Sequence, residues 1–219
     1  MKKIKKILIM LIILVIFLII GVLVYKFFFK TDKNEVKVIK TIDKYGSTLD
    51  ENETKLYKEE FEKLDKILSS EDINYEDYAK EVSKLFIIDF YTLSNKLSKN
   101  DIGGTQFIKE DMRDNFIDQA RSTFYKYVEV KSDKRTQKLP EVSLIDDVKV
   151  EDTKFAIKDK TTTTKTTKVN RYKKSSNETI VDAYKVTISW DYKEDLGYET
   201  EAKMILIKDN NKLYIVEMD

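Results

Sequence analysis

The chain has 219 residues, enough for one folded domain and an anchoring segment. It contains no histidine and no cysteine, which excludes a Ser-His-Asp or Cys-His nucleophile, a zinc site of the usual kind and a disulfide framework. Any metal would have to be a hard cation on carboxylates, and no cofactor site is predicted. After residue 30 the chain carries 34 basic and 39 acidic residues with scattered signs, which argues against nucleic-acid binding.

Residues 1–30 predict a cytoplasmic tail and a membrane anchor. Four lysines precede an apolar run from Ile7 to Tyr25, and nineteen helical residues cover roughly 28 Å, close to a hydrocarbon core of about 30 Å. The run is longer than a signal-peptide core, and no small-x-small cleavage site follows it, so an uncleaved signal-anchor is favoured over a removed signal peptide. Lysines follow the run as well, but long domains are translocated largely regardless of charge. We predict a single-pass cell-membrane protein with its carboxy-terminal domain outside.

Residues 31–53 are interpreted as a spacer that can add a short strand, and residues 54–219 as one extracytoplasmic α+β domain. Apolar side chains at three- and four-residue spacings predict helices from about Thr54 to Ser69-Ser70, from Tyr75 to Leu97 and from Lys109 to Tyr127. The inner face of the third helix is expected to consist of Met112, Phe116, Ala120, Phe124 and Tyr127.

The stretch NDIGGTQF, residues 100–107, holds two adjacent glycines between the second and third predicted helices. A phosphate-binding loop would follow a strand and show GxxxxGK[ST] or GxGxxG spacing, and this stretch does neither. We therefore interpret Asn100, Gly103 and Gly104 as turn residues that accept positive φ.

After Pro140 the apolar period changes to two, which is typical of strands with one exposed face. The alternation predicts strands over residues 142–150, 184–192, 199–208 and 213–217. Asp209, Asn210 and Asn211 join the last two strands in a tight hairpin turn. The expected fold is α+β, with three helices covering the dry face of a curved four-strand antiparallel meander.

This order of elements resembles the nuclear-transport-factor-2-like superfamily, whose cone-shaped domains wrap a curved sheet around a helix. The resemblance covers about residues 54–219. The segments LFIIDFYTLSNKLSKNDIGGTQF and ARSTFYKYV are similar to uncharacterised single-span membrane proteins of low-GC Gram-positive bacteria and their wall-less relatives. Extracytoplasmic scaffold subunits of type IV secretion and conjugation machines resemble the chain in having one span followed by such a domain.

Asp89 is the most informative polar residue, because on a helical wheel it falls within an apolar stripe where an unpaired carboxylate is costly to bury. Arg113 or the amides near Gly103 and Gly104 are the expected partners. Two interpretations stay open: a buried structural pair, or a pocket acid with a raised pKa. Enzymes that resemble this fold, such as ketosteroid isomerase, use an aspartate base, but no catalytic residue can be assigned here.

Two further features have alternative interpretations. Asp146 interrupts the apolar face of its strand and is expected at a bulge or a strand end rather than at a catalytic site. Residues 158–174, KDKTTTTKTTKVNRYKK, carry seven basic residues against Asp159. They are either a basic arm that contacts lipid headgroups, wall polymers or an acidic partner, or a solvated loop between strands.

The favoured function is that of a non-catalytic interaction or assembly module in a bacterial envelope, which binds a protein partner or a second copy of itself. The alternative is a ligand-binding or sensing domain that uses a cavity near Asp89. An isomerase or dehydratase is the third hypothesis.

Overall fold

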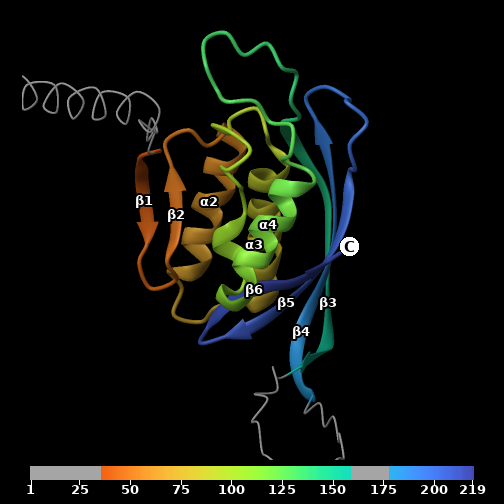
Figure 1. The fold of residues 1–219 in the computed structure, drawn as a ribbon. Helices are drawn as coiled ribbons and strands as arrows, with labels where there is room; N and C mark the ends of the chain where they lie inside the picture. The colour runs from red at the N-terminus through yellow and green to blue at the C-terminus, as the bar shows by residue number, and fades with distance from the viewer. Residues whose placement is uncertain (1–35, 159–177) are drawn as a thin grey trace, which may run out of the picture. The chain divides into compact units, whose positions relative to one another are not determined.

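The computed structural model describes residues 36–158 and 178–219. They form an α+β domain with three α-helices and a four-strand antiparallel sheet, as the sequence predicts (Figure 1). The apolar run Ile7–Tyr25 lies outside the described residues, and so does the basic segment 158–174 apart from Lys158. Within the described ranges, no helix is both long enough and apolar enough to cross a bilayer.

The sheet is a meander in which each strand pairs with the next along the chain. Its strands, in this order, are β3 (Val142–Lys158), β4 (Glu178–Tyr192), β5 (Glu201–Asp209) and β6 (Lys212–Met218). The strands β3 and β4 extend beyond the predicted bounds. In the extension they pair with each other, up to Lys158 opposite Glu178, and β5 pairs no further than Ala183. Asp146 lies at a break in the β3–β4 register, which confirms the expected bulge.

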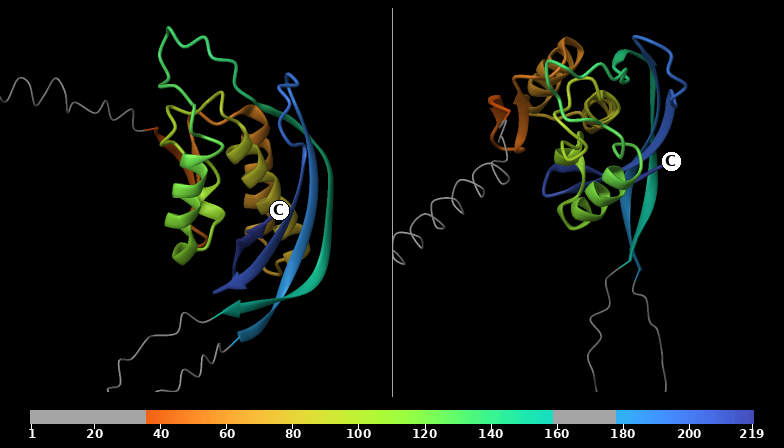
Figure 2. Two further views of the ribbon diagram at one scale, coloured as in Figure 1. Left: turned by 45° about the vertical axis from the view of Figure 1, so that its right-hand side comes forward. Right: turned by 45° about the horizontal axis from the view of Figure 1, so that its top comes forward.

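One face of the sheet packs against the helices. Val186, Ile188 and Trp190 alternate along β4, and each is at most 1% exposed. The Trp190 ring lies 4.7 Å from the ring of Tyr91, centroid to centroid, at the end of α3 (Tyr75–Tyr91). Figure 2 shows the helices on the concave side of the curved sheet, so the main core lies between this side and α3.

The three helices begin where the sequence predicts, and the first also ends as predicted, whereas the second and third end earlier. Thr54 caps α2 (Lys55–Leu68) by accepting a hydrogen bond from the amide of Tyr57 at 3.2 Å. The helix α3 ends at Tyr91 rather than Leu97, because the backbone becomes extended and the amide of Leu93 donates to the carbonyl of Pro140 at 2.9 Å.

The third helix, α4 (Glu110–Ser122), is less buried than its pattern predicted. Ala120 is buried and Phe116 packs against the core, but Met112 is 38% exposed and Tyr127 is 75% exposed. Tyr127 follows the end of the helix, so the helical period no longer sets its direction. The expected inner face was therefore wrong for Met112 and Tyr127.

The segment expected to be a spacer contains a hairpin of β1 (Val38–Ile42) and β2 (Ser47–Asp50). Its residues Tyr45 and Leu49 are buried in the same core as the helices. The hairpin is also tied to the 3₁₀ helix η1 (Thr105–Phe107), because the amide of Thr48 donates to Gln106 Oε1 at 2.8 Å.

Two features of β6 matter for the surface of the domain. Asn210 and Asn211 have φ angles of 50° and 71°, which confirms the tight turn that leads into β6. The other feature is that β6 is an edge strand. In the described part of the chain, its outer edge forms one backbone bridge, from Ile215 to Ile108.

Candidate functional site

Asp89 lies near the carboxy-terminal end of α3, the central helix of the domain. Asn74 caps the start of this helix by accepting hydrogen bonds from the amides of Glu76 and Asp77. Most residues from Tyr78 to Tyr91 are buried, so the helix presents apolar side chains on nearly all sides. Asp89 shares this burial and is only 8% exposed, as its place in the apolar stripe indicated.

Both carboxylate oxygens of Asp89 have a partner. Oδ1 forms an ion pair with the ammonium group of Lys96, which is 3% exposed. Oδ2 accepts a hydrogen bond from the amide of Gly104 at 2.6 Å. One expected partner, an amide of the glycine turn, is therefore present, whereas Lys96 was not foreseen.

The expected pairing of Asp89 with Arg113 was wrong, since no ion pair joins these two residues in the part of the chain that the structure describes. The Arg113 guanidinium instead donates to the carbonyl oxygen of Ile108 at 3.4 Å. Arg113 lies near the start of α4, and Ile108, just before this helix, bridges to β6. The Arg113 side chain therefore binds the backbone at the start of its own helix. Lys96 reaches Asp89 because the chain turns back after Tyr91.

The glycines are required by close approach and by backbone conformation. A Cβ atom on Gly103 would lie 2.2 Å from the carbonyl oxygen of Asp89, which is too close for any residue with a side chain. Gly104 has a φ angle of 73°, in the left-handed region that favours glycine. The Tyr125 hydroxyl accepts from the amide of Gly103 at 3.1 Å and donates to the carbonyl of Phe90 at 2.7 Å. These contacts hold the glycine turn against the end of α3.

Glu53 is the third member of the buried charged cluster, which we define as Asp89, Lys96 and Glu53. Its Oε1 lies 4.0 Å from the Lys96 ammonium, and its side chain is 8% exposed. Its Oε2 accepts a hydrogen bond from Asn95 Nδ2 at 3.3 Å. Burial, and then the charge of Asp89, raise the pKa of Glu53 to about 7 against the opposing effect of Lys96.

Lys96 keeps its charge in this cluster. Burial alone would lower the pKa of its ammonium group, but the carboxylates of Asp89 and Glu53 outweigh that effect and raise the pKa above its ordinary value. The cluster therefore combines a permanent cation with one paired carboxylate and one carboxyl group that titrates near neutrality.

The cluster forms one wall of a polar cavity of about 210 Å³. Val36, the β2 end, the residues before α2 and the glycine turn complete the lining. The charged side chains that line it are Asp50, Glu53, Asp89, Lys96 and Asp101. Two oxygens of lining residues, Asp50 Oδ1 and Asn52 Oδ1, are buried without a hydrogen-bond partner among the described residues.

A second buried charged group lies between α2 and α3. Lys84 Nζ contacts Glu60 Oε2 at 3.2 Å and Glu81 Oε1 at 2.8 Å. Burial raises the pKa of Glu81 to about 7. This group joins two helices and borders no cavity described above, so we interpret it as structural.

Among the described residues, no group of three His, Cys, Asp or Glu side chains is placed to hold a metal ion. Comparisons of the chain with protein-family models, curated proteins and solved structures found no match. The resemblance to the nuclear-transport-factor-2-like superfamily therefore stays a prediction from the sequence.

The first prediction concerns the ion pair. We expect Asp89→Ala and Lys96→Ala each to lower the free energy of unfolding by about 3–5 kcal/mol, because each leaves a buried charge without its partner. Arg113→Ala is the control and should cost less than about 1.5 kcal/mol, the usual value of one hydrogen bond. Urea unfolding of the full chain in detergent, followed by the fluorescence of the single tryptophan Trp190, measures these values. A stabilised Asp89→Ala would contradict a structural role for the pair.

The second prediction concerns pH. The folded domain holds a proton on Glu53 that the unfolded chain releases above the ordinary pKa of 4.5. Stability therefore falls as pH rises from about 4.5 to 7, and the loss from this group is complete above pH 7. Glu53→Gln should reduce the difference in unfolding free energy between pH 5 and pH 8, by at most about 3 kcal/mol.

Urea unfolding at both pH values gives this difference directly. Glu51→Gln is the matched control, since Glu51 is exposed and two residues away. The titration of Glu81 also lowers the free energy of unfolding as pH rises. Because Glu81 is unchanged in both variants, its contribution cancels in the comparison. An equal pH dependence in Glu53→Gln and the wild type would refute the assignment.

Proposed function

We propose that the chain is a membrane-anchored extracytoplasmic interaction module that assembles with a partner protein in a cell envelope. The anchor is inferred from the apolar run Ile7–Tyr25. The observation that carries the interaction function is an apolar groove between α4 and the edge strand β6.

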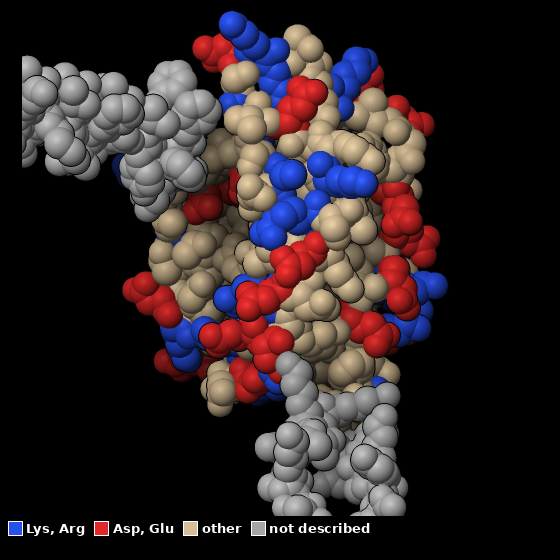
Figure 3. Space-filling model, viewed as in Figure 1, with Lys and Arg blue, Asp and Glu red and all other residues tan. Residues whose placement is uncertain are grey.

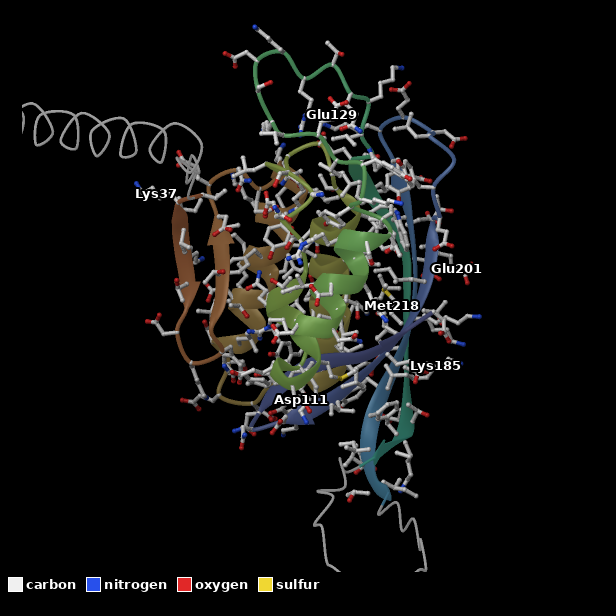
Figure 4. All side chains as sticks on the ribbon, viewed as in Figure 1. Lys37, Asp111, Glu129, Lys185, Glu201 and Met218 are labelled. Carbon is white, nitrogen blue, oxygen red and sulfur yellow. The ribbon has the colours of Figure 1, made fainter. Side chains whose placement is uncertain are left out.

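The groove has a volume of about 280 Å³ and is lined mainly by apolar side chains. They come from three elements: Phe86 and Phe90 from α3, Met112, Phe116 and Ala120 from α4, and Ile215 and Met218 from β6. Figure 4 labels Asp111 in the first turn of α4 and Met218 at the end of β6, which mark the two sides. In α4, only Ala120 is fully buried, so this amphipathic helix leaves apolar surface uncovered.

The groove favours an extended segment as the occupant. The end of β6 next to the groove belongs to the edge of the sheet, where backbone groups can pair with an added strand. Alternate side chains of such a strand would enter the groove beside Met112 and Phe116. Binding by strand addition thus uses both the backbone edge and the apolar lining.

The charges around the groove favour basic residues beside that segment. The exposed residues of α4 include four acids, Glu110, Asp111, Asp114 and Asp118, against two arginines in the helix. In Figure 3, acidic side chains lie over α4 on the face toward the viewer. We therefore specify the occupant as an extended apolar segment of a partner protein, flanked by lysine or arginine.

The sequence resemblance to type IV secretion and conjugation scaffolds supports an assembly role by analogy of plan. A second candidate function is ligand binding. The polar cavity favours this function, because a ligand-binding or sensing domain needs a cavity and Asp89 lies in the wall of this one.

The third prediction tests the topology. The chain lacks cysteine, so single cysteines can be introduced at Ser132, an exposed position, and at Lys3. A membrane-impermeant maleimide added to intact cells should label the cysteine at position 132 and not the one at position 3. Labelling of both after lysis is the control. The reverse pattern in intact cells would place the domain in the cytoplasm.

The fourth prediction tests the groove. A photo-crosslinking amino acid in place of Met112 should form adducts in cells, whereas one at Val130, which is 73% exposed and away from the groove, should not. Mass spectrometry of the adduct should locate the crosslink in an apolar partner segment with lysine or arginine beside it. Adducts only between copies of this chain, or equal adducts at both positions, would contradict the proposed partner.

A further inference from the structure

We infer that the polar cavity next to the buried charged cluster binds a small protonated amine. This inference rests on the second candidate function, ligand binding, and names the class of ligand. It follows from the size of the cavity, the charges of its wall and the hydrogen-bonding groups that the wall leaves unsatisfied.

The size of the cavity suits a ligand of a few heavy atoms. A cavity of about 210 Å³ is smaller than the roughly 300–1,000 Å³ of sites for drug-sized ligands. Since a water molecule occupies about 30 Å³ in the liquid, the cavity has room for about seven. A ligand with three to six heavy atoms fits within this volume.

The charges of the wall favour a cation. Lys96 is neutralised by its ion pair with Asp89, which leaves the carboxyl groups of Asp50, Glu53 and Asp101. Glu53 is more than nine-tenths buried, and no hydrogen bond to its Oε1 is found within the described residues. The nearest cation to that oxygen is Lys96, at 4.0 Å, beyond hydrogen-bonding distance. Asp50 Oδ1 is a buried carboxylate oxygen without a hydrogen-bond donor among the described residues, which favours a cation as the occupant.

The unsatisfied groups favour N–H donors over a bare charge. Asn52 Oδ1, like Asp50 Oδ1, is a buried acceptor without a donor among the described residues. A primary ammonium group supplies three donors and one positive charge, which suits acceptors on separate residues. A directly coordinated metal ion fits less well, since no three acidic side chains of the described residues converge for it.

Proton linkage gives the inference an independent signature. The groups that act on the titration of Glu53 are Asp50, Asp89, Lys96 and Asp101, and with burial they raise its pKa to about 7. An ammonium ion beside Glu53 would favour the ionised carboxylate, so the amine should displace a proton on binding near neutral pH. The affinity should therefore increase between pH 6 and pH 8.

The test is thermal unfolding of the full chain in detergent micelles, followed by Trp190, which is 1% exposed. n-Propylamine and 1,3-diaminopropane should raise the melting temperature in a saturable manner, by about 5–10 °C at about a hundred times Kd. At equal ionic strength, propan-1-ol, propionate, calcium and tetramethylammonium, which is a cation without N–H groups, should have no such effect.

Variants locate the binding. Glu53→Gln and Asp50→Asn should weaken amine binding at least tenfold, and the increase in affinity with pH should disappear in Glu53→Gln. Glu51→Gln, an exposed neighbour of the same type, should bind as the wild type does. The ligand-free melting curve of each variant shows that it is folded, and neither substitution at the site removes a positive charge.

Each other result has a definite meaning. Equal stabilisation by tetramethylammonium or calcium would overturn recognition of an amine, although ligand binding would stand if Glu53→Gln abolished the effect. Stabilisation by propionate or propan-1-ol in place of the amines would also overturn the class. If none of these compounds shifted the melting temperature of the wild type, ligand binding at this cavity would fail together with the inference.

Discussion

The ion pair between Asp89 and Lys96 is the contact on which the arrangement of the helical layer depends. It joins the end of α3 to a chain segment, residues 92–104, that forms neither helix nor strand. The amide of Gly104 occupies the other oxygen of Asp89, and Glu53 extends the cluster to the start of α2. A buried ion pair adds little net stability compared with apolar packing, so we assign it the role of selecting one path for this segment.

Most of the fold could be predicted because hydrophobic periodicity records which face of each element is buried. The structure confirms the strand predicted from the alternation in β4, the helix predicted from the apolar stripe in α3, and the turn at Asn210 and Asn211. Element ends were less predictable, since they depend on distant partners. The sequence near Leu93 continues a helical pattern, and it is the carbonyl of Pro140 that provides the competing hydrogen bond.

The candidate site was only partly visible in the sequence for the same reason. Asp89 was identified because a carboxylate within an apolar stripe needs compensation. Lys96 lies seven residues later and, on a continuous helix, would be about 10 Å away along the axis, so it was not a candidate. Glu53 belongs to a segment interpreted as a spacer. Once α3 ends at Tyr91, the returning chain brings these residues together.

The chain reaches β1 through Val36, beside the cavity, so a pulling force on the chain before Val36 would act on the cavity wall. Val36 lines the cavity, and β1 follows at once, with Val38 opposite Asp50 at the open end of the hairpin. Tension on the chain before Val36 acts first on this end of the ladder, where strands separate one pair at a time, and only later on the main core. The outermost contact is the hydrogen bond from the amide of Glu51 to the carbonyl of Lys37, and the pair that includes Asp50 comes next, so pulling would dismantle the cavity wall while α3 and the sheet stayed folded. An occupant bound to Asp50 would resist that separation, which would make the force needed to open the hairpin depend on the contents of the cavity.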